Sequence, residues 1–173
     1  MENFLRLKHW QAFSIYASGL LLHILFMIYN FKFGNISSLE LSGLFAILTL
    51  VFFFLWVLAI GLFANNIKEN PYKFRNGLLI FAVLCSTIGY SYLNIERIGL
   101  TIEIIPEWVS LILSPFTIFG VIYTFYNVSK SLKSIELNRK ATFSEYFLDA
   151  ILLFAFPIGV WFIQPRINSA CKK

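Results

Sequence analysis

The chain has 173 residues, of which 58% are hydrophobic and only 13% are charged, and its mean hydropathy is +0.74. This balance excludes an ordinary soluble domain, and the long apolar runs lack the alternation of barrel strands, so we expect an all-α integral membrane protein with one domain over residues 1–173. The net charge of +5 is spread over the loops, which indicates membrane topology and argues against nucleic-acid binding.

Four apolar runs are long enough to cross a bilayer as helices. The first follows Arg6 and Lys8 as in a signal peptide, but it is too long for one and no small-residue cleavage site follows it. We therefore expect an uncleaved first span. The predicted spans are residues 13–31, 41–64, 77–95 and 106–127, and the last of them opens with Pro106, Glu107 and Trp108.

Two capping-box patterns predict helix starts. Ser37 and Glu40 precede the second span, and Thr142 and Glu145 precede the last helical segment with the same spacing. Capping accounts for both glutamates without a functional role.

Prolines also mark the helices. Asn70 followed by Pro71 suits an N-cap and the first residue of the third span. Pro115 lies inside the fourth span and frees one backbone carbonyl, and Ser114 or Thr117 is placed to help satisfy the local backbone.

Small residues share one face of the third span: Ala82, Cys85, Ser86 and Gly89. Small residues at this spacing let helices approach closely in lipid, so we predict that this face is the buried helix-packing seam of a bundle. Cys85 is then a packing residue, and Cys171 is an incidental thiol of the polar tail.

The last apolar stretch, residues 150–163, is the hardest to place. At about 1.5 Å per residue its fourteen residues span roughly 21 Å, less than a bilayer core of about 30 Å. Pro157 lies at its middle and Gly159 adds backbone freedom, so we expect a break there. The segment is either a re-entrant or half-inserted hairpin, or a fifth span that begins near Tyr146 and carries Asp149 into the membrane.

The positive charges favour the hairpin. With a cytoplasmic N-terminus, a hairpin puts twelve of the fourteen Lys and Arg residues inside and leaves Lys32 and Arg97 outside, whereas a fifth span gives nine against five. Four spans plus a hairpin broken at Pro157 is therefore the preferred topology. The loop at residues 128–141 is the most basic part of the chain in this arrangement.

A hairpin has a consequence for two charged residues. Asp149 lies eight residues before Pro157 and Arg166 lies nine after it, so a bend at the proline returns both to the same depth. We predict that they pair. In one straight helix they would be about 26 Å apart.

The ending FPIGVWFIQPRIN, residues 156–168, resembles the C-termini of small uncharacterised multi-pass membrane proteins of bacteria. The resemblance covers about the last quarter of the chain. It implies a bacterial inner-membrane protein and carries over no catalytic or binding residue.

No motif for a metal, a cofactor or a hydrolytic reaction is present, and the chain has only two histidines. Glu96, Glu103 and Glu107 lie near Arg97 in one predicted loop, where a solvated surface is a better interpretation than a cation site. His23 lies near the middle of the first span. A neutral imidazole bonded to a hydroxyl of a neighbouring helix is expected, with a proton-relay role as the alternative.

We therefore expect a non-enzymatic membrane protein without cofactors, embedded in the lipid bilayer, that acts as an assembly or accessory component, either as a homo-oligomer or within a membrane complex. The alternative is a small ion or solute transporter or channel that uses His23 and Asp149. A membrane enzyme acting on a lipid would need a cluster of carboxylates or histidines that the sequence does not contain.

Overall fold

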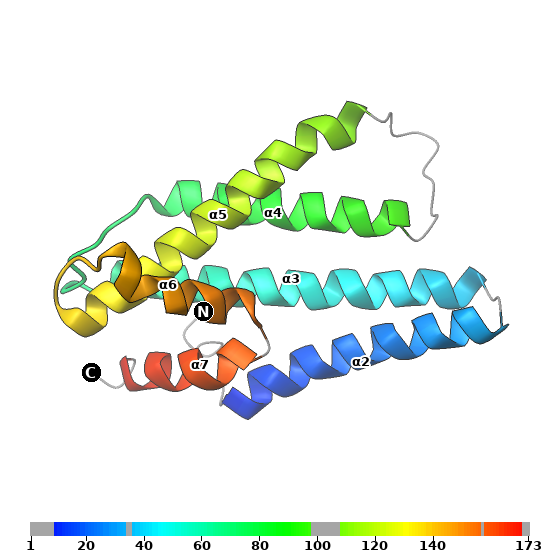
Figure 1. Cartoon of the computed structure of the whole chain (residues 1–173), viewed down its shortest axis with the longest axis horizontal. Coiled ribbons are helices and arrows are strands. Elements are labelled where there is room, and N and C mark those ends of the chain that lie inside the picture. Colours follow the sequence, from blue (N-terminus) through cyan, green and yellow to red (C-terminus); the bar gives the residue numbers. More distant parts are fainter. Residues whose placement is uncertain (1–8, 34–35, 98–107, 157, 171–173) are drawn as a thin grey trace.

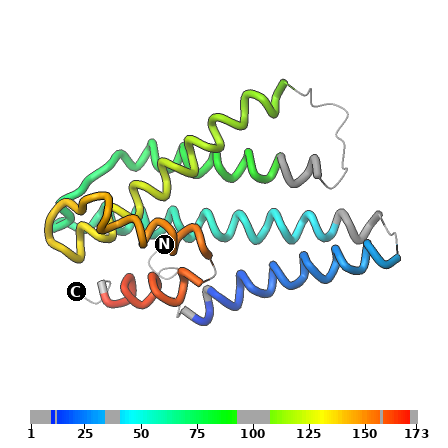
Figure 2. Tube along the Cα trace, viewed as in Figure 1, coloured from blue at the N-terminus to red at the C-terminus, as the bar shows by residue number. Residues whose placement is uncertain are grey.

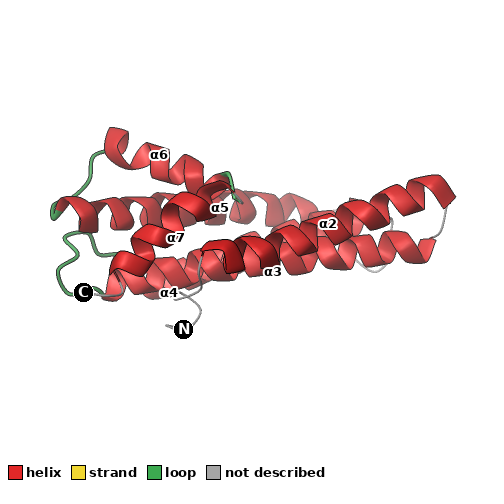
Figure 3. Cartoon of the chain, turned by 90° about the horizontal axis from the view of Figure 1, so that it is seen from below, coloured by secondary structure: helices red, strands yellow, loops and turns green. Residues whose placement is uncertain are grey.

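A computed structural model describes residues 9–33, 36–97, 108–156 and 158–170, and within these ranges the chain forms six helices and no strand. The all-helical class predicted from the sequence is confirmed for this part of the chain (Figure 3). The helices are α2 (His9–Phe33), α3 (Ile36–Asn66), α4 (Asn76–Arg97), α5 (Trp108–Leu137), α6 (Phe143–Phe154) and α7 (Ile158–Ala170).

Helices α2, α3 and α4 run back and forth roughly side by side, and α5 runs obliquely to them (Figure 1). Helix α3 is central and contacts α2, α4 and α5. The short helices α6 and α7 fold back on each other and reach only part of the way along α3 (Figures 1 and 2). Helix α6 packs against α5, and α7 packs against α6 and α2. The start of α6 and the end of α7 therefore lie at the same end of the bundle.

Within the described residues, three helices are long and apolar enough to cross a membrane. The stretches that meet this test are Phe13–Phe33, Leu41–Asn66 and Trp108–Leu137. The third predicted span lies in α4, whose apolar part Asn76–Tyr92 is shorter. Helices α6 and α7 together would make a further crossing by length, but the chain bends by 118° between them.

The hairpin turn depends on a close approach at Gly159. A Cβ atom added there would lie 1.7 Å from the backbone carbonyl oxygen of Leu152, so a side chain cannot be accommodated without moving the backbone of α6. The Gly159 N–H donates to the carbonyl of Ala155 across the break. The sequence identified the break correctly, although Pro157 itself lies outside the described residues.

The predicted end of the fourth span near residue 127 and the basic loop at 128–141 are wrong, because α5 continues to Leu137. Serine and lysine residues in this stretch resemble a loop, but the hydroxyls of Ser129 and Ser134 donate to carbonyls four residues earlier in the same helix. Val128 is fully buried in the core. The loop is limited to residues 138–142.

Two predicted helix starts also differ from the structure. Helix α3 already begins at Ile36, so Ser37 is not its N-cap. Helix α4 begins at Asn76 rather than at Pro71. The Asn70 side-chain oxygen accepts the Tyr72 N–H at 2.9 Å, as an N-cap would, but its amide group donates to the carbonyl of Ala64 at the end of α3 and no helix begins at Pro71. The Thr142 capping box is confirmed, since the Thr142 N–H donates to the Glu145 carboxylate at 2.8 Å.

Helix α5 runs through Pro115 without a break in the helix. The two neighbouring hydroxyls bond to helix carbonyls, Ser114 to that of Ser110 at 2.6 Å and Thr117 to that of Leu113 at 2.8 Å. Neither of these carbonyls is that of Leu111, four residues before Pro115, which the proline leaves without its helical donor, so the described contacts do not bear out the predicted role of these hydroxyls.

The hydrophobic core lies where α3 meets α5 and the hairpin. Its largest fully buried side chains include Trp56 and Ile60 of α3 and Ile163 and Ile167 of α7. Phe156, next to the hairpin turn, contacts the rings of Phe53, Trp56 and Tyr16. The turn is thus anchored by aromatic packing at about the middle of the bundle (Figure 1).

Candidate functional site

The predicted pair of Asp149 and Arg166 is present. Asp149 on α6 is 4% exposed, and each of its carboxylate oxygens accepts a hydrogen bond of 2.8 Å from the Arg166 guanidinium on α7. Such a bidentate contact matches the planar geometry of both groups. It links the two arms of the hairpin and neutralises the buried carboxylate.

Glu136 is a third member of this charge cluster. The Arg166 Nε–H donates to the Glu136 carboxylate, and Glu136 also accepts a hydrogen bond of 3.0 Å from Lys133 on the same helix. The sequence analysis did not predict a contact for Glu136, because it placed this residue in a loop. Arg166 therefore connects α5, α6 and α7.

A second ion pair closes the loop between α5 and α6. The Arg139 guanidinium donates to both oxygens of the Glu145 carboxylate. This hydrogen bonding raises the pKa of Arg139 above its ordinary value. Because Glu145 also caps α6 through Thr142, one carboxylate fixes both the loop and the start of the helix.

The ammonium group of Lys130 is surrounded by tyrosine rings. It lies 4.6 Å from the ring centroid of Tyr72, 5.0 Å from that of Tyr126 and 5.9 Å from that of Tyr146. It also donates a hydrogen bond of 2.8 Å to the Tyr126 hydroxyl. Cation–π contact of this kind stabilises a lysine near the end of a span by about 0.5–1 kcal/mol. No sequence pattern predicted this cluster, because its rings come from three separate elements.

The predicted helix-packing seam on α4 faces α5. Ala82, Ser86 and Gly89 are buried, and Cys85 is half-buried. A Cβ at Gly89 would lie 1.7 Å from the hydroxyl oxygen of Thr117. The approach is reciprocal, because a Cβ at Gly120 of α5 would lie 2.3 Å from the carbonyl oxygen of Ala82. The seam is therefore used within the chain.

A buried hydrogen bond attaches α7 to α3. The Trp56 indole N–H donates to the side-chain oxygen of Gln164 at 2.8 Å, and both side chains are fully buried. The sequence reading gave no role to Gln164. A polar residue in the second half of an apolar hairpin was the available signal, but its partner lies 108 positions away.

His23 has the hydroxyl partner expected from the sequence. Its Nδ1 lies 2.9 Å from the carbonyl oxygen of Ser42 on α3 and 2.9 Å from the Ser42 hydroxyl. The Ser42 hydroxyl also donates to the His23 carbonyl at 3.2 Å. A carbonyl only accepts hydrogen bonds, so we assign the proton of the neutral ring to Nδ1.

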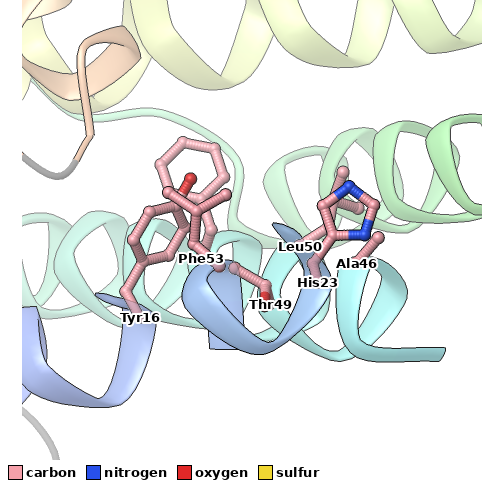
Figure 4. Close-up of a pocket in the computed structure, with 7 residues that line it drawn as sticks. Tyr16, His23, Ala46, Thr49, Leu50 and Phe53 are labelled. Carbon is pink, nitrogen blue, oxygen red and sulfur yellow. The ribbon is translucent and has the colours of Figure 1, made fainter. Parts of the chain in front are cut away.

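A cavity of about 190 Å³ lies beside His23, between α2 and α3. In Figure 4 the rings of Tyr16 and Phe53 lie at one end of this cavity, and His23 lies near Ala46 and Leu50 at the other. Thr49 lines it too, but the Thr49 hydroxyl donates to the Phe45 carbonyl of its own helix. The polar groups that line this cavity are therefore His23, Tyr16 and the Thr49 oxygen, which can still accept a hydrogen bond.

The structure does not bring His23 and Asp149 together among the described contacts. His23 is held by Ser42 on α3, whereas Asp149 is held by Arg166 at the base of the hairpin. No group of three or more His, Cys, Asp or Glu side chains that would hold a metal ion occurs in the described part of the chain.

Several predicted positions lie outside the described residues or side chains. They are Glu103, Glu107, Cys171 and the side chains of Glu96 and Arg97. The predicted acidic loop is thus left as a prediction from the sequence.

Neither the known protein families nor the curated proteins nor the solved structures gave a match to this chain.

Proposed function

We propose that this protein is a non-enzymatic component of the bacterial inner membrane that assembles with copies of itself or within a larger membrane complex. The observation that carries the proposal is a row of exposed leucines on α3. Helix α3 is the central helix of the bundle, yet Leu41, Leu44, Leu48 and Leu55 on one of its faces are 42–54% exposed.

The spacing of these leucines is that of a heptad repeat. Positions 41, 44, 48 and 55 correspond to a, d, a and a, and Val51 completes the series at the remaining d position. A straight face of this period suits a second helix that crosses at about 20° with interlocking side chains. Two copies of α3 provide such a pair.

The occupied seam on α4 supports this choice of surface. Gly89 and Ser86 already pack against α5, so they are not available to a partner. The row of leucines on α3 has no such cover in the described part of the chain.

Disulfide crosslinking tests the proposed assembly. In a chain with Cys85 and Cys171 changed to alanine, we expect Leu48→Cys to form disulfide dimers in native membranes under mild oxidation. Leu84→Cys on α4 is the matched control, because Leu84 is 53% exposed against 54% for Leu48. Equal crosslinking at both positions, or none at position 48, would contradict assembly through α3.

We also propose that α2 to α5 cross the membrane, that α6 and α7 form a half-inserted hairpin, and that the N-terminus is cytoplasmic. At about 1.5 Å per residue, the 12 and 13 residues of α6 and α7 correspond to roughly 18 and 20 Å, too short for a bilayer core of about 30 Å. The distribution of positive charge supports the same arrangement. The basic loops at residues 67–75 and 138–142 lie at the end of the bundle where α7 finishes, and Lys32 lies at the other end (Figure 1).

Reporter fusions test this topology. We expect fusions after residues 140 and 173 to report the same, cytoplasmic side. A periplasmic signal from the fusion after residue 173 alone would reject the hairpin and leave a fifth crossing.

Transport through His23 and Asp149 is the alternative proposal, and the contacts support it less. Each of these groups already has a close structural partner, Ser42 for His23 and Arg166 for Asp149. Proton-driven flux in liposomes that His23→Ala abolishes would favour transport over assembly.

A further inference from the structure

We propose that the cavity between α2 and α3 binds a neutral lipid whose hydroxyl group donates a hydrogen bond to His23 and whose second oxygen, at the other end of the head group, accepts one from Tyr16. This inference is independent of the proposed assembly, because the cavity lies within one chain. It depends on three features: the free hydrogen-bonding atoms, their depth and the shape of the apolar space.

Besides the Thr49 oxygen, the cavity offers one hydrogen-bond acceptor, on His23, and one donor, on Tyr16. With its proton on Nδ1 and bonded to Ser42, His23 is left with Nε2 as an acceptor. The Tyr16 hydroxyl is a donor. Neither Nε2 nor this hydroxyl has a hydrogen-bond partner among the described residues, and both side chains line the cavity. A ligand that donates at one end and accepts at the other would satisfy both groups.

The depth of the site selects an uncharged ligand. His23 lies at the midpoint of the apolar stretch Phe13–Phe33, so a ligand bound to it has its polar atoms in the middle of the proposed membrane. A charged head group is strongly disfavoured at this depth. Phosphates and carboxylates are therefore excluded, whereas a hydroxyl, an ester carbonyl or a quinol ring is tolerated.

The apolar space around the site suits a hydrocarbon tail. A second cavity of about 150 Å³ shares Leu50 and Phe53 with the first and extends to Phe154 at the end of α6. Each cavity alone is smaller than common ligand pockets of about 300–1,000 Å³. Leu50 and Phe53 line both, so a tail that starts beside His23 would pass these two side chains to enter the second cavity. The hairpin turn limits this space, since Phe156 contacts both Tyr16 and Phe53.

Two lipid classes share this chemistry: diacylglycerols, and the quinol form of isoprenoid quinones. We would add 1,2-dioctanoylglycerol or decylubiquinol to the full chain in detergent and follow the thermal unfolding midpoint, because a ligand that binds the folded state raises it. We expect a saturable rise of the unfolding midpoint with at least one of the two lipids. The lipid that binds with the higher affinity identifies the class. Dioctanoylglycerol with its hydroxyl acetylated, and decylubiquinone, lack the donor and should bind at least tenfold more weakly than their hydroxyl counterparts.

Variants locate the binding site. Ala46→Phe fills the cavity and should weaken binding at least tenfold, while Ser14→Phe places the same ring on the opposite face of α2 and should change it less than twofold. His23→Leu removes the acceptor and should weaken binding at least tenfold. Tyr16→Phe removes only the donor hydroxyl and should weaken binding several-fold, which gives a test even where His23→Leu does not fold. Absence of a saturable rise with both lipids, equal affinity for the forms without the hydroxyl, or an unchanged affinity in Ala46→Phe would each overturn the proposal.

Discussion

Removing the Arg166 side-chain charge should destabilise the protein more than removing the charge of its partner Asp149. In Arg166→Gln, the Asp149 carboxylate is left 4% exposed without a cation, and loss of one partner of a buried pair costs about 3–5 kcal/mol. In Asp149→Asn, Arg166 keeps its contact with Glu136, so we expect a smaller loss of about 1.5–3 kcal/mol. The double variant should lose less than the sum of the two single losses, because no uncompensated charge is left buried.

The free energy of unfolding, measured by denaturant titration in mixed micelles, gives the four values of this double-mutant cycle. For a chain of this length, a loss of 3 kcal/mol corresponds to a lower melting temperature by roughly 6–12 °C. Arg139→Gln is the matched control, since it makes the same substitution in the exposed pair with Glu145 and should have little effect. Additive losses in the cycle, or an Arg166→Gln variant as stable as Arg139→Gln, would refute the reasoning.

Two further predictions concern close contacts within the bundle. Gly159→Ala and Gly89→Ala should each lower the free energy of unfolding by about 1–3 kcal/mol, because the added Cβ would lie 1.7 Å from a neighbouring atom, whereas Gly77→Ala is the control with open space around it. Equal free energies of unfolding for all three variants in denaturant titration would contradict the role of these close contacts. Gln164→Leu should cost about 1–3 kcal/mol by leaving the buried Trp56 N–H unpaired, and adding Trp56→Phe should cost less than the sum of the two changes. If the double variant loses as much stability as the two single variants together, the hydrogen bond has no role in docking α7.

The sequence by itself determined the helical class, the apolar runs that become α2, α3 and most of α5, and the break in the last segment. These features follow from hydrophobicity, from chain length and from proline and glycine chemistry, which act locally. The same reasoning reached the contact between Asp149 and Arg166, because a single bend relates their depths and no other long-range information is needed.

The tertiary structure decided the features that depend on distant partners. The stretch after residue 127 resembles a loop until the packing of Val128 and the rings around Lys130 are known, and Asn70 resembles a helix cap until Ala64 lies beside it. Likewise, the seam on α4 predicts close packing from its small residues, but only the approach of Gly120 on α5 identifies its partner.

The hydrogen-bond partners of polar residues in the apolar part of the bundle were also decided by the tertiary structure. A glutamine or a serine in an apolar segment indicates that some partner must exist, because a buried polar group without a hydrogen bond is costly. The sequence around such a residue does not identify its partner. Gln164 bonds to Trp56 and Ser42 to His23 because folding brings α7 and α2 against different parts of α3, and that arrangement is set by the packing of the whole bundle.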